Sequence, residues 1–331
     1  MPSFIFHAPC PFGLEGLLAD EIRALNADPD LIRSAKGGVS FAGGLELGMA
    51  VCLHSRFATR VLLRVAFDEY WDSRDVYALA KKTPWEKWFG TDTTFRIHSS
   101  ANRCPLESLD FATLRIKDGL CDRFTELVGR RPSVEKRSPD VRIEAYFTFD
   151  HVSFYIDLAG ESLFKRGWRL EHGEAPLKEN LGWKPELPLV DPFCGSGTIA
   201  IEAAAMATNT APGLMRRFAF ERLQGFDMAL WQEMKEDARA AQNRSAKVFI
   251  RASDISTIVV EKAEENCRRA GFGALLDDGR IVFHQGDARS IKAPEGAEGG
   301  LVIANPPYGE QSNPKSASIA AMMADFAAAL K

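Results

Sequence analysis

The sequence predicts an α/β protein of 331 residues in which two small α+β regions precede a doubly wound sheet of parallel strands. Three observations carry this prediction. Strand-like segments alternate with helical segments from about residue 168 onward, four of those strands end in polar or glycine-rich turns, and the first 70 residues alternate strand and helix in a shorter pattern. Ligands of such parallel sheets bind where the strands end, so we expect the functional residues in those four turns.

The first region, residues 4–70, is expected to run strand, helix, strand, helix, strand, which is the order of a ferredoxin-like unit. Its segments in chain order are FIFHAPC, GLEGLLADEIRALN, VSFAG, LELGMAVCLHS and ATRVLLRVAFDEY. The second region, residues 71–168, is expected to contain a helix in DVYALAKKTPWEKWF, the strand TFRIHSS and a helix in ATLRIKDGLCDRFTELVG. VRIEAYFTFD and HVSFYIDLAG then predict a hairpin with Asp150 and His151 at its tip.

The third region alternates strands with helices, which predicts a parallel sheet covered on both faces. Leu189 and Val190 lead into DPFCGSGTIAIEAAAMA, and the strand KVFIRASD leads into a helix in STIVVEKAEENCRRAG. IVFHQGDAR and LVIANPPYG supply two more strand ends. The four turns that follow these strands should converge on one crevice.

Composition narrows the class of protein. Hydrophobic residues make up 46% of the chain and charged residues 26%, which is typical of a globular protein, and neither a transmembrane helix nor a signal peptide is indicated. Six scattered cysteines without C-x-x-C spacing predict neither a zinc site nor a disulfide framework, and favour a cytoplasmic location. Residues 96–170 hold 13 Lys and Arg against 11 Asp and Glu, which indicates either an ordinary solvated surface or a local RNA-facing patch.

The first glycine-rich turn follows Val190. Its two glycines, Gly195 and Gly197, allow close backbone approach, and the amides of the following helix favour a carboxylate or phosphate. A dinucleotide fingerprint would need a ribose-binding acid about 20 residues further on, but Asp254 lies 57 residues beyond Gly197 (254 − 197). The spacing therefore disfavours a nicotinamide or flavin cofactor.

Two later strand ends carry carboxylates. Asp254 can accept hydrogen bonds from both hydroxyls of a ribose, and Asp287 can accept one from the exocyclic amino group of an adenine. A single Asp at such a place is most often a helix cap or a surface group, but three features in chain order favour a ligand. S-adenosylmethionine has an amino-acid end for the glycine turn, a ribose for Asp254 and an adenine for Asp287.

The last turn, Asn305-Pro306-Pro307-Tyr308, resembles the [DNS]-P-P-[YFW] motif of class I methyltransferases that modify exocyclic amino groups. The lone pair of such an amino group is delocalised into the base, so its two N–H bonds need acceptors while the nitrogen becomes tetrahedral. The Asn305 side-chain oxygen and the Pro306 carbonyl can supply those acceptors. Tyr308 can stack on a base taken out of its helix. A plain proline turn would need neither flanking side chain.

The junction DLAGESLFKRGWR to GEAPLKEN is similar to that between a THUMP RNA-binding domain and its methyltransferase domain. The whole chain resembles bacterial 23S rRNA guanine-N2-methyltransferases, often labelled N6-adenine-specific DNA methylases. The resemblance implies a ferredoxin-like domain at 1–70, a THUMP domain at 71–168 and a Rossmann-like methyltransferase domain at 169–331. It also implies a helical insertion ahead of Asp254, which accounts for the long spacing.

Carried over residue by residue, the resemblance implies a catalytic set and a cofactor set, with no metal. Catalysis would fall on Asn305, Pro306 and Tyr308. The S-adenosylmethionine site would comprise Asp191, Pro192, Cys194, Gly195, Ser196, Gly197, Thr198, Asp254, Ile255, Asp287, Ala288 and Asn305. S-adenosylhomocysteine would be the product form of this cofactor.

The sequence departs from the family in two places. Family members have a further stretch of helix between KEN-L and the next G-W, whereas Leu181 is followed directly by Gly182. The family's catalytic sheet also has strands beyond the point where Lys331 stands, and a sheet without them would leave an open edge. We expect residues missing at both places and a methyltransferase domain that is incomplete at its C-terminus.

The function expected from these observations is transfer of a methyl group from S-adenosylmethionine to guanine N2 in 23S rRNA, in the cytoplasm and without a membrane. An alternative of the same chemistry is adenine N6 methylation of DNA or RNA, because Asn305 does not distinguish the two amino groups. An alternative of another class is a non-catalytic RNA-binding factor in ribosome assembly. Asn305 argues against this alternative, since a site without catalysis has no need of its carboxamide.

Overall fold

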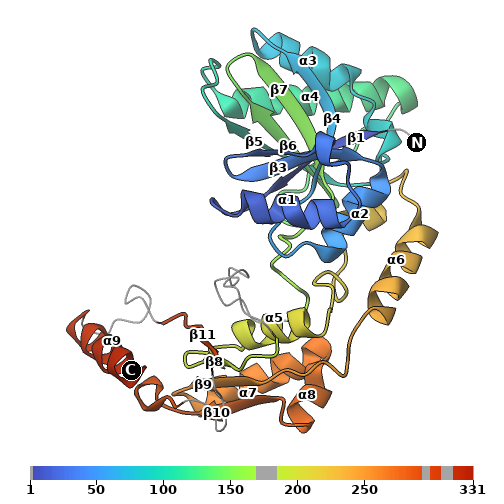
Figure 1. Cartoon of the computed structure of the whole chain (residues 1–331). Coiled ribbons are helices and arrows are strands. Elements are labelled where there is room, and N and C mark those ends of the chain that lie inside the picture. Colours follow the sequence, from blue (N-terminus) through green and yellow to red (C-terminus); the bar gives the residue numbers. More distant parts are fainter. Residues whose placement is uncertain (1–2, 169–184, 293–298, 307–315, 331) are drawn as a thin grey trace. The chain divides into compact units, whose positions relative to one another are not determined.

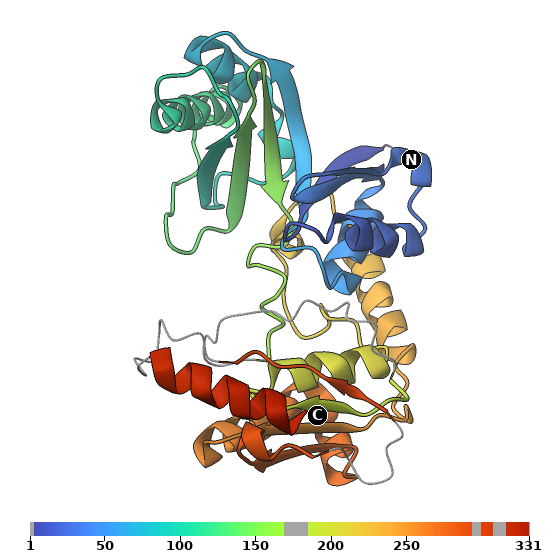
Figure 2. The ribbon, with the colours of Figure 1, turned by 60° about the vertical axis from the view of Figure 1, so that its left-hand side comes forward.

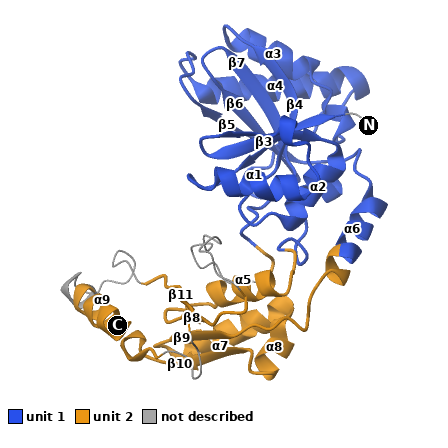
Figure 3. Cartoon of the chain, in the orientation of Figure 1, with its two compact units in different colours: residues 1–165, 212–237 blue, residues 166–211, 238–331 orange. Residues whose placement is uncertain are grey.

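The computed structural model describes residues 3–168, 185–292, 299–306 and 316–330 (Figure 1). The chain divides into two compact units (Figure 3). The first contains residues 1–165 and 212–237, and the second contains residues 166–211 and 238–331. Within the described residues, no helix is both long enough and apolar enough to cross a membrane.

The first unit is built on one seven-stranded sheet in the order β2-β3-β1-β4-β7-β6-β5. All neighbouring strands are antiparallel except β5 and β6, which are parallel. The strands are β1 (Phe4–Pro9), β2 (Arg33–Ala35), β3 (Gly38–Gly43), β4 (Leu62–Glu69), β5 (Phe95–Ala101), β6 (Val141–Phe147) and β7 (His151–Asp157). The helices of this part are α1 (Glu15–Ala24), α2 (Leu45–His54), α3 (Ser73–Lys82) and α4 (Leu109–Val128), with the short turns η1 (Pro29–Leu31) and η2 (Trp85–Lys87).

Strand β4 joins the two regions that the sequence suggested as separate domains. It pairs with β1 at two positions and with β7 at seven, so the ferredoxin-like and THUMP parts share one continuous sheet (Figure 1). The predicted hairpin is present, because β6 and β7 pair antiparallel around residues 148–150. The predicted strand and helix order of both regions is confirmed, with β2 as an additional short strand.

One face of this sheet forms the core of the first unit. Residues directly opposite each other across paired strands lie on the same face, and the register makes one apolar row across six strands. That row consists of Phe41, Phe6, Leu63, Ile156, Ile143 and Ile97. On the same face, Ser99 hydrogen bonds Thr113 of α4 at 2.6 Å, and Phe6 lies against Gly48 of α2. The helices therefore cover this face.

The predicted helical insertion belongs largely to the first unit. Residues 212–237 include η3 (Ala219–Arg222) and most of α6 (Met228–Ala240). Trp231 packs edge-on against Phe218 and Phe220, with ring centroids 5.6 and 5.0 Å away. Arg216 donates hydrogen bonds to four backbone carbonyls of residues 159–165, just after β7. These contacts explain why residues 212–237, although they lie between β8 and β9 in the chain, pack with the first unit.

The second unit contains a parallel sheet in the order β10-β9-β8-β11. The strands are β8 (Leu189–Asp191), β9 (Ile250–Asp254), β10 (Ile281–Gln285) and β11 (Leu301–Val302). The helices are α5 (Thr198–Ala207), α7 (Thr257–Cys267), α8 (Gly273–Asp277) and α9 (Ser316–Ala329), with η4 (Arg268–Phe272) and η5 (Ala288–Ser290). In Figure 2, α5 (yellow-green) runs along one side of these strands, and α9 (red) is a separate helix. The predicted parallel α/β region is confirmed.

The strand order creates a switch point beside β8. The chain passes from β8 outward to β9 and β10, and then returns to place β11 on the opposite side of β8. Connections that leave a strand in opposite directions open a crevice at the carboxyl ends of the strands. The turns after β8 and β11 border this switch point, which is where ligands of open parallel sheets bind.

Candidate active site

The glycine turn between β8 and α5 uses the backbone freedom of its two glycines. Gly195 and Gly197 have φ values of +50° and +85°, where residues other than glycine are disfavoured. A Cβ atom on Gly197 would lie 3.1 Å from the Ala263 Cβ and 3.2 Å from the Phe283 ring. The first turn of α5 therefore packs closely against its neighbours, and its amides face the crevice.

Asp254 connects the ends of β8 and β9. Its Oδ2 accepts a hydrogen bond from the Gly195 amide at 3.2 Å, and its Oδ1 accepts one from the Ser256 amide at 3.1 Å. The Cys194 amide also donates to the Ser253 carbonyl at 2.8 Å. A carboxylate has about four acceptor positions, so Asp254 can hold the glycine turn and still accept from a ligand hydroxyl.

Asp191 is fully buried at the end of β8. Its Oδ1 accepts a hydrogen bond from the Phe193 amide at 3.2 Å. Its buried Oδ2 has no hydrogen-bond partner among the described residues. Burial raises the pKa of Asp191 to about 7, with a further contribution from the nearby Asp254 carboxylate. A buried oxygen without a donor is costly, so this atom is suited to a cationic ligand group.

The raised pKa of Asp191 predicts a pH-dependent stability of the second unit. The folded group keeps its proton up to about pH 7, whereas the ordinary value is 3.8. The folded chain holds the extra proton between these values, so the free energy of unfolding should fall by roughly 3–4 kcal/mol as pH rises through that range. Hydrogen–deuterium exchange protection of residues 186–207 measures this fall. Asp191→Asn should abolish it, while Asp278→Asn, at an exposed acid, should retain it; an equal slope in both variants would contradict the assignment.

The Asp287 carboxylate has local partners that the sequence did not reveal. It accepts hydrogen bonds from the Arg289 amide at 2.9 Å and from the Arg289 guanidinium at 2.6 Å. These contacts lower the pKa of Asp287 to about 2. The Gly286 amide donates to the Asp254 carbonyl at 3.0 Å, which brings this turn beside the end of β9. Arg289 therefore occupies part of the accepting capacity of Asp287, and its role as the adenine acceptor stays a prediction.

Asn305 follows β11, the strand that pairs with β8. Strand β11 pairs with β8 through Leu301↔Leu189 and Val302↔Val190, and the Ile303 amide donates to the Val190 carbonyl at 2.9 Å. Because β8 and β11 are parallel, Asn305 and Pro306 follow β11 at the sheet edge where the glycine turn follows β8. Pro307 and Tyr308, which the sequence analysis placed in the catalytic turn, lie outside the described residues.

The remaining predicted cofactor residues occupy different environments. Cys194 and Ala288 are buried, and burial raises the pKa of the Cys194 thiol well above its ordinary range. Ile255 is 69% exposed directly after Asp254 and leaves an apolar surface beside the carboxylate. Within the described ranges, no cluster of three or more His, Cys, Asp or Glu side chains could hold a metal ion.

Asn266 is a site residue that the sequence analysis missed. It is buried on α7, where its Nδ2 donates to the Ser196 carbonyl at 2.9 Å. Its Oδ1 accepts from Arg269 at 2.5 Å. Asn266 thus holds the glycine turn in position through the Ser196 carbonyl. The sequence feature that could have revealed it is an amide side chain on the apolar face of a helix, between Ala263 and Ala270.

These features define an α/β domain with a buried carboxylate, a glycine turn and a second carboxylate at the ends of β8 and β9. The domain lies within a known family: the family described as RMKL-like, methyltransferase domain, matches residues 166–331. This chain belongs to that RMKL-like methyltransferase family. An RlmL ferredoxin-like domain matches residues 5–62, and a THUMP domain matches residues 71–157.

Curated relatives are similar over most of this chain. A ribosomal RNA large subunit methyltransferase K/L from Psychromonas ingrahamii is 40% identical over 319 residues, covering 92% of this chain and 41% of the relative. The protein of the same description from Aeromonas salmonicida is 37% identical, covering 92% of this chain and 45% of the relative. The chain thus spans less than half the length of these relatives.

Solved structures share the fold. A Listeria monocytogenes protein described as a predicted N6-adenine-specific DNA methylase has a TM-score of 0.86 and 29% identity, covering 98% of this chain and 85% of that one. Another, described as a candidate methyltransferase complexed with SAH, has a TM-score of 0.84 and 27% identity, covering 100% of this chain and 87% of that one. Both similarities extend across the two units.

Proposed function

We propose that this protein transfers a methyl group from S-adenosylmethionine to the exocyclic N2 amino group of a guanine in 23S rRNA. The observation that carries the proposal is the β8–β11 pairing, which brings Asn305 and Pro306 to the edge where Asp191 stands. A buried acid for the cofactor and an amide for the base thus border one switch point. The names of the curated relatives support large-subunit rRNA as substrate.

The cofactor fits the donor and acceptor groups of the crevice. The unpartnered Oδ2 of Asp191 suits the ammonium group of the methionine part, and the amides of the first turn of α5 suit its carboxylate. Asp254 accepts from the ribose hydroxyls, and Asp287 from the adenine amino group. The similar structure complexed with SAH supports this assignment.

The residues of the last turn would prepare the accepting nitrogen. When bound, S-adenosylmethionine supplies an electrophilic methyl group on a sulfonium. Asn305 Oδ1 and the Pro306 carbonyl accept the two N–H bonds of the base, which favours a tetrahedral nitrogen with an available lone pair. The N–C bond forms as the S–C bond breaks, the electron pair stays on sulfur, and the amino group then loses a proton to solvent.

The two alternatives differ in what they require. Adenine N6 methylation uses the same acceptors, and the description of the similar Listeria protein favours it as the second candidate. A non-catalytic assembly factor would keep the RNA-binding parts without needing Asn305. We favour guanine N2 because the whole-chain resemblance is to guanine-N2-methyltransferases, and we place the reaction in the cytoplasm, during or before large-subunit assembly.

The test is a methylation assay with purified chain, unmodified 23S rRNA and methyl-labelled S-adenosylmethionine, followed by mass spectrometry of nucleosides. Labelled N2-methylguanosine is the expected product. Labelled N6-methyladenosine would transfer the assignment to the second candidate. Cofactor binding without any labelled nucleoside would overturn the catalytic proposal, and tight binding of NADH in place of the cofactor would overturn the assignment of the crevice.

A further inference from the structure

The face of the seven-stranded sheet opposite α1–α4 contains a concavity of about 700 Å³. Its side chains alternate along the strands with those of the apolar row, so they point away from the helices. Cross-strand register places Ser40, His7 and Leu62 in one row on this face, and His98, Glu144 and Tyr155 in another. The concavity therefore extends over strands of both the ferredoxin-like and the THUMP parts.

Positive charge predominates in this concavity. Four of the residues that line it are Lys or Arg, namely Lys36, Arg60, Arg96 and Arg142, whereas Glu144 is the one acid among the lining residues that the structure describes. The Glu144 carboxylate accepts a hydrogen bond from His98 Nδ1 at 2.7 Å, so it already has a partner within the concavity. Such a lining attracts a polyanion.

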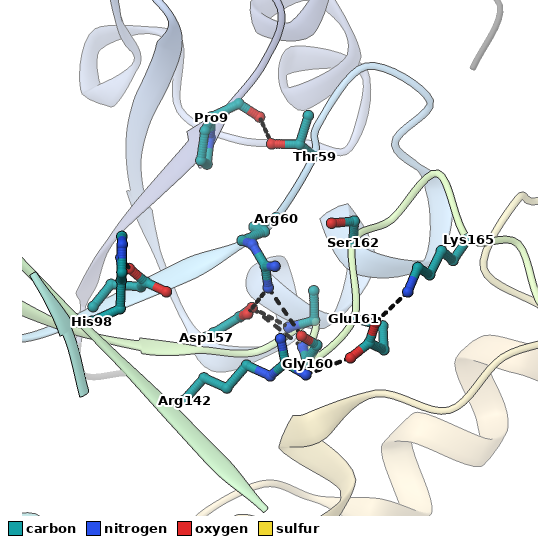
Figure 4. Close-up of polar contacts among 12 residues, drawn as sticks. Pro9, Thr59, Arg60, His98, Arg142, Asp157, Gly160, Glu161, Ser162 and Lys165 are labelled. Atoms are coloured by element: carbon teal, nitrogen blue, oxygen red, sulfur yellow. Dashed lines mark hydrogen bonds and ion pairs between the residues drawn. The ribbon is translucent and has the colours of Figure 1, made fainter. Parts of the chain in front are cut away.

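Two of these cations form ion pairs with carboxylates that do not line the concavity. Arg60 pairs with the buried Asp157 and donates to the Gly160 carbonyl at 2.9 Å, and Arg142 pairs with Glu161 (Figure 4). The other two, Arg96 and Lys36, have no carboxylate within ion-pair distance in the described parts of the chain. Arg96 donates instead to the Lys136 carbonyl at 3.3 Å. Arg96 and Lys36 are therefore the cations most available to a phosphate, and Arg96 is the one of the two that lies on a strand of the THUMP part, β5.

Aromatic side chains lie between the cations. Tyr155 on β7 is half-buried and lines the concavity, with its ring centroid 6.4 Å from that of His7. Tyr146 on β6 is 39% exposed and lines the same hollow. A Tyr ring on an open sheet face offers a flat surface on which a nucleobase can stack. Neither ring is needed for the apolar row on the other face.

We propose that this concavity binds a single-stranded segment of the RNA substrate, with a base stacked on Tyr155 and a phosphate at Arg96. The inference rests on the proposed RNA substrate and assigns the surface that holds it. A duplex hides its base faces inside its stack, whereas a single strand presents both bases and phosphates. Interleaved rings and cations in a hollow match the single strand.

The experiment measures binding of a fluorescent 12-nucleotide single-stranded RNA of mixed sequence by anisotropy, with the same strand annealed to its complement for comparison. Tyr155→Leu and Tyr146→Leu each remove a ring, and Arg96→Ala removes a phosphate contact. Matched controls are Tyr77→Leu and Lys81→Ala, whose side chains pair with Asp122 and Glu126 across α3 and α4. Calorimetric S-adenosylmethionine binding and the circular dichroism spectrum check that each variant is folded.

The single strand should bind more tightly than the duplex. Tyr155→Leu or Tyr146→Leu should weaken its binding at least fivefold, and Arg96→Ala should reduce the slope of log K against log salt by about 0.7. The controls should bind like the unsubstituted chain. Tighter duplex binding, or unchanged affinity and salt slope in the folded concavity variants, would overturn the inference.

The outcome is separable from that of the methylation assay. Tyr155-dependent binding without methyl transfer from the unsubstituted chain would leave this surface in place and overturn the proposed reaction. Methyl transfer that is unaffected by all three concavity substitutions, with unchanged RNA affinity, would overturn the surface and leave the reaction in place.

Discussion

Replacing Asn305 with alanine should lower methyl transfer to RNA by at least about 100-fold while leaving S-adenosylmethionine affinity nearly unchanged. The Asn305 carboxamide lies at a strand end, where its oxygen can accept an N–H bond of the reacting base. That acceptor matters most as the amino nitrogen becomes tetrahedral, so its loss falls on the rate and not on cofactor binding. Single-turnover methylation and calorimetry with the same protein preparation measure the two effects.

Asn305→Asp provides the matched control, because it keeps an acceptor oxygen at the same position in a side chain of nearly equal volume. It should retain far more of the single-turnover rate than Asn305→Ala. A near-normal rate in Asn305→Ala would show that the turn after β11 has only a structural role. A parallel loss of cofactor affinity would show that Asn305 acts through the cofactor site.

Asp254→Ala should weaken S-adenosylmethionine binding by about 1–3 kcal/mol, a factor of roughly 5 to 150. The substitution removes the acceptor proposed for the ribose hydroxyls, and the Gly195 amide loses the carboxylate oxygen that lies 3.2 Å away. The substitution therefore affects both the ligand and the turn that cradles it. Isothermal titration with S-adenosylmethionine and S-adenosylhomocysteine measures the change.

Asp254→Asn separates these two contributions. The amide oxygen can still accept from Gly195, so the turn keeps its hydrogen bond, while the second oxygen that would accept a ribose hydroxyl becomes an NH₂ donor. We expect intermediate affinity for this variant. Unsubstituted affinity in both Asp254 variants would remove this residue from the cofactor site.

Most local elements could be predicted from the sequence because their patterns are short-range. Alternating strands and helices predicted the parallel sheet, and the structure confirms that its strands end at one edge. Gly195 and Gly197 signalled a turn with close backbone approach, and both adopt positive φ values in the structure. Each of these signals lies within a few residues of the feature that it determines.

Features that depend on residues far apart in the sequence were harder to predict from the sequence. The pairing of β4 with β7 joins residues about 90 positions apart, and no local pattern specifies which strand will be a neighbour. The packing of residues 212–237 with the first unit depends on contacts such as those of Arg216 with carbonyls beyond β7. Asn266 was missed for a similar reason, since its role depends on where Ser196 lies in space.

The segment 96–170 shows how structure changes the meaning of a charge count. The sequence left open whether its cations form a solvated surface or face RNA. Several have carboxylate partners, including Lys117 with Asp118, Arg123 with Glu86 and Arg130 with Asp92. Exposed pairs of this kind contribute little to stability, but they reduce the charge available to a phosphate. Arg96 and Arg142 both line the open concavity, but Arg142 pairs with Glu161, whereas Arg96 has no carboxylate partner among the described residues.

The central position of β4 has a consequence for synthesis on the ribosome. Strand β1 meets β4 at only two positions, so β4 depends mainly on β7, which begins 82 residues after β4 ends (151 − 69). At about 5–20 residues per second, β4 would wait roughly 4–16 s for its partner, with one edge open to wrong pairing. Binding of the nascent segment by a chaperone during that interval would protect the edge, and premature termination between residues 70 and 150 would release a chain prone to aggregation.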